Sequence, residues 1–118
     1  MISSFTVFEE PRNTPILHEC DLCVIGGSCT GLFAAIRAAR LGLSVAIVEQ
    51  QNCFGGVATN SLVNVWHSLL DTEYKQTIIG GLTAEIIERL KRRGVVRVVE
   101  RNHGVGFIFN SEELKIDL

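Results

Sequence analysis

The sequence predicts an α/β fold built on a Rossmann-like βαβ dinucleotide-binding module. Two short apolar runs, 21–25 and 44–49, are typical of strands, and residues between them recur at helical spacing. The first run ends in a glycine-rich turn that leads directly into the predicted helix. Strand, helix and strand in this order predict a pair of parallel strands. A further helix and a β-hairpin follow, and we expect the domain to be incomplete.

Composition restricts the class of protein. The chain has 118 residues, of which 47% are hydrophobic and 20% charged, as expected for one globular domain. A net charge of -2 without a long basic face argues against a nucleic-acid partner. No apolar run approaches the roughly 20 residues that cross a bilayer, so we expect no membrane partner. Residues 1–20 lack the features of a secretory signal, which predicts a cytoplasmic protein in a reducing compartment.

The first half of the chain contains an arm and the βαβ unit. Pro11 and Pro15 exclude a helix from residues 1–19, which we expect to form an extended arm. The apolar run at 21–25 predicts a buried, parallel strand. A helix is predicted over 30–41, with its apolar stripe and its small residues facing the sheet: Leu32, Ala35, Ile36, Ala38 and Ala39.

The second half contains less regular signals. The loop 50–56 is polar and rich in glycine, and residues 57–74 show no period that predicts an element. An amphipathic helix is predicted over 82–93, followed by a hairpin with strands 95–100 and 105–109 and a turn that includes His103. Asn110 then begins another helix, and its brevity suggests that a longer design has been cut.

The turn after the first strand carries the strongest chemical signal. Gly26, Ser28 and Gly31 occupy the three positions of a dinucleotide-binding fingerprint, and the helix that begins near Cys29 would direct its N-H groups at a pyrophosphate. Glu49 ends the second strand, where a carboxylate binds ribose hydroxyls and repels the 2′-phosphate of NADP. Ser28 replaces the middle glycine, so its side chain either crowds the pyrophosphate or donates a hydrogen bond to it. The alternative is an ordinary small turn between strand and helix.

Other chemistry-bearing residues allow simpler interpretations. Cys20 and Cys23 have the spacing of a metal or redox pair, but no second ligand pair follows, so we expect small buried thiols and no metal site. Cys53 has no recognisable base beside it. Trp66 and His67 form either a packed tryptophan with a hydrogen-bonded histidine or an acid-base group beside a substrate. The sequence therefore identifies no catalytic residue.

Three segments together resemble a known family. Residues 21–31, Val48-Glu49 and 54–59 are similar to the N-terminal FAD-binding region of FAD-dependent oxidoreductases related to fumarate reductase flavoproteins. The resemblance implies that the glycine turn and helix hold the FAD pyrophosphate, that Glu49 binds the adenosine ribose, and that the second glycine segment lies near the flavin. Carried over by position, the expected cofactor-binding residues are Gly26, Gly27, Ser28, Cys29, Thr30, Gly31, Glu49, Gln50, Gly55, Gly56, Val57, Ala58 and Thr59.

The same resemblance separates the chain from two related types of flavoprotein. Disulfide reductases of the glutathione reductase type carry a Cys-x-x-x-x-Cys pair after the paired glycines, whereas residues 57–63 contain no cysteine. Flavoproteins of the succinate dehydrogenase type attach FAD through a histidine just before that pair, and none occurs between Gln50 and Gly55. The resemblance therefore implies FAD that is held non-covalently.

The expected function follows from the resemblance. Residues 1–118 would form the N-terminal part of an FAD-binding Rossmann-like domain, with 21–49 as its βαβ unit. The whole protein would transfer hydride between a small organic substrate and the flavin, and this chain alone would be inactive. Its partner would be the missing C-terminal part or another subunit. The alternative is a stand-alone, non-catalytic module that binds NAD or an adenine nucleotide and acts with a partner chain.

Overall fold

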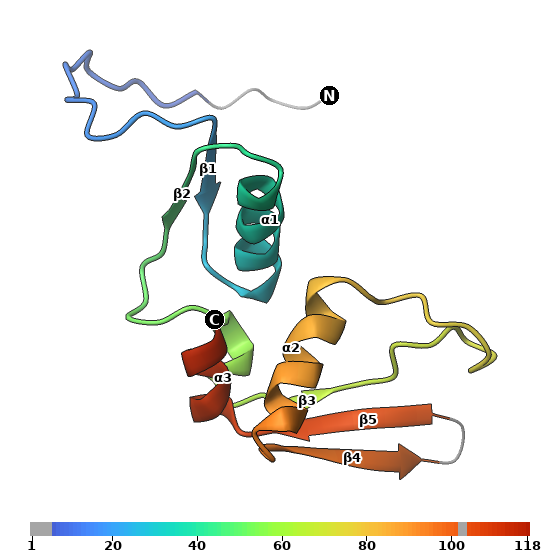
Figure 1. Ribbon diagram of the computed structural model, residues 1–118. Coiled ribbons are helices and arrows are strands. Elements are labelled where there is room, and N and C mark those ends of the chain that lie inside the picture. Colours follow the sequence, from blue (N-terminus) through green and yellow to red (C-terminus); the bar gives the residue numbers. More distant parts are fainter. Residues whose placement is uncertain (1–5, 102–103) are drawn as a thin grey trace, which may run out of the picture.

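The computed structural model describes residues 6–101 and 104–118, which contain two separate sheets (Figure 1). The elements in chain order are β1 (Leu22–Ile25), α1 (Cys29–Arg40), β2 (Val45–Val48), a 3₁₀ turn (Gly56–Ala58), β3 (Val65–Trp66), α2 (Leu82–Arg92), β4 (Val96–Arg101), β5 (Gly104–Phe109) and α3 (Ser111–Asp117). The predicted α/β class and the order of the predicted elements are confirmed.

The βαβ unit forms a two-stranded parallel sheet. β1 pairs with β2 from Leu22 opposite Val45 to Ile25 opposite Val48. Its side chains alternate between half-buried and exposed, and Ile25 is 78% exposed. The strand is parallel as predicted but only half-buried, because helix α1 packs against one face of this sheet and no second layer covers the other face among the described residues. An uncovered face is consistent with an incomplete Rossmann-like module.

Helix α1 starts one residue earlier than predicted and buries a narrow stripe. Leu32, Ala35 and Ala38 are buried, whereas Ala39 is exposed. A helix turns once every 3.6 residues, so the helical period is compatible with burial of either Ala38 or Ala39. In the structure Ala38 is the one that packs towards the sheet. Two small residues on the stripe allow the helix backbone to lie close to the strands.

The second sheet has the order β3-β5-β4 and is antiparallel. β4 and β5 form the predicted hairpin, with Val96 opposite Phe109 and Arg101 opposite Gly104. The predicted turn residue His103 lies outside the described residues. The short strand β3 was not predicted; it pairs Val65 with Ile108 at the free edge of β5.

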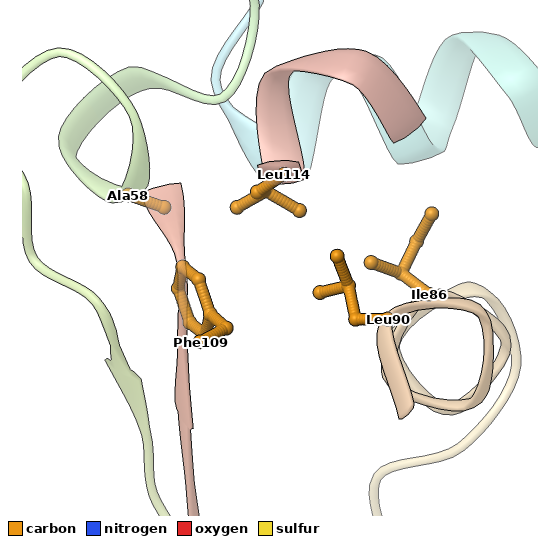
Figure 2. Packing of buried hydrophobic residues seen from close by; sticks show 5 residues of the cluster. All are labelled: Ala58, Ile86, Leu90, Phe109 and Leu114. Atoms are coloured by element: carbon orange, nitrogen blue, oxygen red, sulfur yellow. The ribbon is translucent and has the colours of Figure 1, made fainter. Parts of the chain in front are cut away.

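The main hydrophobic core belongs to this second half of the molecule. Helices α2 and α3, the end of β5 and the 3₁₀ turn surround it (Figure 2). Its buried members are Ala58, Ile86, Leu90, Phe109 and Leu114. The Trp66 ring packs against Phe109 with 4.7 Å between the centroids. Because Ala58 belongs to this core, the core holds the C-terminal end of the glycine-rich segment, residues 55–58, in place.

Helix α3 begins where the sequence predicts. The Asn110 side chain accepts hydrogen bonds from the backbone N-H groups of Glu112 at 2.9 Å and Glu113 at 3.3 Å. Arg93, just after α2, forms ion pairs with Glu113 and with Asp117. A cap and these ion pairs thus hold a helix of seven residues against α2.

The chain is more extended than a compact domain. Its radius of gyration is 18.9 Å, against about 13 Å expected for a compact domain of this length. Residues 6–19 contain no helix or strand and are exposed, and residues 1–5 of the predicted arm lie outside the described part. Figure 1 shows residues 6–19 on the far side of the βαβ unit from the β4–β5 hairpin. Among the described residues, no helix is long and apolar enough to span a membrane.

Candidate cofactor-binding site

The glycine turn between β1 and α1 brings two backbones into close contact. Gly26 has a φ of +98°, a conformation that residues with a side chain rarely adopt, and its N-H donates to the Val48 carbonyl at 2.8 Å. A Cβ added to Gly31 would lie 2.0 Å from the Gly26 carbonyl oxygen. Only glycine fits at residue 31, so the helix starts tightly against the turn, as the fingerprint predicts.

The first turn of α1 faces outward. Ser28 and Thr30 are exposed, and Cys29 is half-buried. The Ser28 hydroxyl accepts a hydrogen bond from the Gly31 N-H at 3.4 Å and so caps the helix. No acidic residue lies in this turn. The positive end of the helix dipole is therefore available to an anion.

Glu49 connects the glycine turn to the loop that follows β2. Its carboxylate accepts hydrogen bonds from the Gly27 N-H at 2.5 Å and from the Gln51 N-H at 2.8 Å. The bonds from Gln51 and Gly27 lower the pKa of Glu49 below its ordinary value. The side chain is thus an ionised acceptor beside the turn, which is the form that binds ribose hydroxyls. Gln50, the next residue, is exposed.

The second glycine segment lies directly against the first. The Gly55 N-H donates to the Gly27 carbonyl at 2.8 Å, and Gly55 forms an isolated parallel bridge with Ser28. A Cβ on Gly27 would lie 2.4 Å from the Phe54 ring. The two predicted segments, more than 20 residues apart in sequence, are therefore brought together at the N-terminus of α1.

Two of the expected residues direct their side chains away from this surface. Ala58 is 3% exposed and belongs to the core, and Thr59 is fully buried. The Thr59 hydroxyl donates to the Phe54 carbonyl at 2.6 Å. Both residues would face a cofactor through their backbone alone, whereas Val57 is 64% exposed and Gly56 half-buried.

A cleft of about 330 Å³ begins at this site. We call it the α1 cleft; it lies between the first turn of α1 and the segment around β3, and its lining includes Cys29, Thr30, Phe33, Trp66, His67 and Leu69. Trp66 is packed, as one interpretation expected, and the exposed His67 lies at the cleft. Phe33 and Leu69 were not singled out in the sequence, because residues from separate segments meet here only in the folded chain.

The cysteines differ from the predicted buried thiols. Cys23 is exposed on the uncovered face of β1, and the other three are half-buried. Burial raises the pKa of the Cys29 thiol, which donates to the Gly55 carbonyl at 3.4 Å. Cys53 donates to the Asn60 side chain at 3.1 Å. All four are free, and no group of three or more His, Cys, Asp or Glu within the described residues could hold a metal ion.

A glycine turn that opens a helix, with an acid after the next parallel strand, defines a dinucleotide-binding α/β protein. Residues 21–116 match the family described as FAD dependent oxidoreductase, and the chain belongs to this family. This confirms the predicted family and its cofactor, FAD.

Proteins similar in sequence include flavoprotein dehydrogenases that are several times longer than this chain. The mitochondrial dihydrolipoyl dehydrogenase of Schizosaccharomyces pombe is 30% identical over 108 residues, which are 82% of this chain and 21% of the relative. The dihydrolipoyl dehydrogenase of Trypanosoma brucei brucei is 46% identical over 49 residues, 42% of this chain and 10% of the relative. The 3-oxosteroid 1-dehydrogenase of Mycobacterium tuberculosis is 33% identical over 82 residues, 61% of this chain and 15% of the relative. No solved structure matches the chain significantly.

Proposed function

We propose that this chain holds FAD non-covalently and forms the cofactor-binding part of an oxidoreductase that transfers hydride between a small organic substrate and the flavin. The observation that carries the proposal is the close approach of Gly31 to the Gly26 carbonyl. A Cβ added to Gly31 would lie 2.0 Å from that carbonyl oxygen. That contact places the N-terminus of α1 against the turn, where the pyrophosphate of a dinucleotide binds.

The residues present fit FAD. The N-H groups of the first α1 turn would hold the pyrophosphate, because the turn is exposed and free of acidic residues. The ionised carboxylate of Glu49 would hold the adenosine ribose. Gly55 is buried and a Cβ on it would lie 2.5 Å from the Thr59 side chain, while a Cβ on Gly56 would lie 3.0 Å from Ser28, so glycine at both positions lets this segment lie against the start of α1. When bound, FAD supplies the redox chemistry, and the chain supplies position and electrostatics.

We do not extend dithiol chemistry from the dihydrolipoyl dehydrogenases to this chain. Residues 57–63 contain no cysteine, and the four thiols present are free. The proposal includes a small-molecule substrate, a cytoplasmic location and no nucleic-acid partner. We also propose that the chain alone is inactive, because the chain spans only about a fifth or less of the length of the relatives described above. A C-terminal part or a partner subunit would complete the enzyme.

A charge placed on the first turn of α1 tests the cofactor site. Thr30→Glu adds an acid where the helix dipole favours one, so folding should be unharmed. The same charge should repel the pyrophosphate and weaken FAD binding at least about tenfold, or about 1.4 kcal/mol. Thr30→Gln is the neutral control and should bind as the natural chain does. FAD retention is measured by visible absorption after desalting, and acid precipitation should release all of the flavin.

The outcomes separate the proposal from its alternative. Equal FAD retention by Thr30→Glu and Thr30→Gln would contradict the pyrophosphate site. If FAD is not retained but NAD raises the melting temperature, the chain is a stand-alone nucleotide-binding module. Flavin that stays with the acid precipitate would contradict non-covalent binding.

A further inference from the structure

Helix α3 is bonded to the second glycine segment, residues 54–59. The Ser111 hydroxyl, at the first residue of α3, donates a hydrogen bond to the Ala58 carbonyl at 2.7 Å. Ser111 is 6% exposed and Ala58 is 3% exposed, so water has little access to this bond. The two residues are 53 positions apart in the sequence. The bond therefore fixes the segment to a helix that belongs to the core half of the molecule.

The second glycine segment extends this contact along its own backbone. Its residues form a tight turn, in which the Ala58 N-H donates to the Gly55 carbonyl at 3.3 Å. The Thr59 hydroxyl closes the same turn by donating to the Phe54 carbonyl at 2.6 Å. Because the turn is bonded across both of these pairs, a constraint on the Ala58 carbonyl also restricts Gly55.

Gly55 connects the segment to the turn that begins α1. Its N-H donates to the Gly27 carbonyl at 2.8 Å. The far end of α3 lies beside the same residue, since a Cβ on Gly55 would be 2.9 Å from the Leu118 side chain. A continuous series of contacts thus leads from Ser111 through Ala58 and Gly55 to Gly27, in the candidate cofactor site.

We propose that Ser111 is a positioning residue of the cofactor site, and that its hydroxyl holds the second glycine segment against the start of α1. Without the hydroxyl, the Ala58 carbonyl would lose this donor inside the core, and the segment would shift to bring the oxygen to water. That shift opens the contact between Gly55 and Gly27 and lowers the fraction of molecules that are ready to bind a cofactor. The effect on FAD rests on the proposed function, whereas the effect on Gly55 does not.

Hydrogen exchange of the full chain without FAD tests the positioning directly. Ser111→Ala removes the hydroxyl and leaves the Asn110 cap of α3 in place. The Gly55 amide should then exchange at least about fivefold faster relative to the Gly26 amide than it does in the natural chain. Gly26 is the internal reference, because its N-H donates to the Val48 carbonyl within the βαβ unit.

Ile87→Val is the matched control for a general loss of stability. Ile87 is 2% exposed and lies outside the described core cluster around Ala58. Removal of one buried methyl group there lowers the melting temperature through lost packing. This variant should leave the ratio of the Gly55 and Gly26 exchange rates as in the natural chain.

FAD affinity is the second readout, measured by fluorescence titration at a temperature at which both variants are folded. Ser111→Ala should bind FAD at least about threefold more weakly than the natural chain, and Ile87→Val should bind it equally. A merely structural role of Ser111 would give both variants the same affinity. If the natural chain does not bind FAD, the proposed function is overturned, and hydrogen exchange alone decides the role of Ser111.

A third measurement needs no variant. If α3 holds the segment, each opening of α3 also exposes the Gly55 amide to exchange. Gly55 should therefore be protected no more strongly than Leu114, whose N-H donates to the Asn110 carbonyl at 3.0 Å within α3. Stronger protection of Gly55 than of Leu114 would overturn the inference. So would an unchanged exchange ratio in folded Ser111→Ala, or undiminished FAD affinity of that variant when the natural chain binds FAD.

Discussion

The carbonyl oxygen of Gly26 occupies the space that a side chain on Gly31 would need, with 2.0 Å between that oxygen and an added Cβ. Gly31 lies inside helix α1, where alanine is intrinsically better than glycine by about 1 kcal/mol. We predict the opposite sign here. Gly31→Ala should destabilise the chain by about 1–3 kcal/mol, because the backbone must shift to relieve the overlap. Urea unfolding measures the change.

Gly80→Ala is the control for this prediction. A Cβ on Gly80 would meet no atom within 4 Å, so alanine should be neutral or stabilise the chain by up to about 1 kcal/mol through the unfolded state. Stabilisation by Gly31→Ala similar to that by Gly80→Ala would show that the helix does not approach the turn as described.

Thr59 should stabilise the segment that carries Gly55 and Gly56. Its hydroxyl, fully buried, donates to the Phe54 carbonyl at 2.6 Å. Thr59→Val keeps the shape of the side chain but leaves that carbonyl without its donor, at a cost of about 1–3 kcal/mol. Thr72→Val, at an exposed position, should change stability by less than about 0.5 kcal/mol. Comparable effects of the two substitutions in thermal unfolding would argue against this role for the hydrogen bond.

The sequence predicted the βαβ unit well because its signals are local. The glycines at 26 and 31 and the alternating apolar run before Glu49 lie within one short segment, and each constrains the next element. The short strand β3 has no such signal, because Val65 and Trp66 become a strand only by pairing with Ile108 and Phe107. The outward face of β1 was missed for a related reason: apolar content cannot show whether a second layer is present to cover it.

The candidate site shows the same division. Spacing predicts Gly26, Gly31 and Glu49 as cofactor-binding residues, and their positions along the chain follow from a single turn and a single strand. It could not show that the Glu49 carboxylate accepts from Gly27, or that Thr59 faces the core, because these contacts depend on how two loops pack together. The α1 cleft likewise combines segments that are distant in the sequence.

The ion pairs of Glu85 predict a pH dependence of stability at acidic pH. Hydrogen bonds from Arg40 and then Arg89 lower the pKa of Glu85 from 4.5 to about 2. Because the pKa is lower in the folded chain, the contribution is fully present above pH 4.5 and is lost as the pH falls towards 2. Glu85→Gln should therefore flatten the dependence of melting temperature on pH within this window. The effect should be modest, since the ion pairs are exposed and screened by salt.

Glu88→Gln provides the comparison on the same helix. The Glu88 carboxylate accepts from Lys91 of the same helix at 2.7 Å, whereas Glu85 connects α2 to Arg40 at the end of α1. Glu88→Gln should leave most of the acid dependence in place. If both variants retain the natural pH profile, the Arg40–Glu85 pair does not contribute to acid stability.

Leu62 offers a position where glycine should stabilise the chain. Its φ is 55°, and its side chain is 63% exposed, so it combines an unfavourable backbone conformation with little burial. Leu62→Gly removes about 1–2 kcal/mol of backbone strain. Glycine also increases the freedom of the unfolded chain by about 0.5–1 kcal/mol, so the expected net gain is about 0.5 kcal/mol. Val63→Gly, next along the chain and outside the left-handed region, should instead destabilise it, because valine there is half exposed and unstrained. Opposite signs for these neighbouring substitutions in urea unfolding would support the backbone conformation at Leu62, and a loss of stability in both would contradict it.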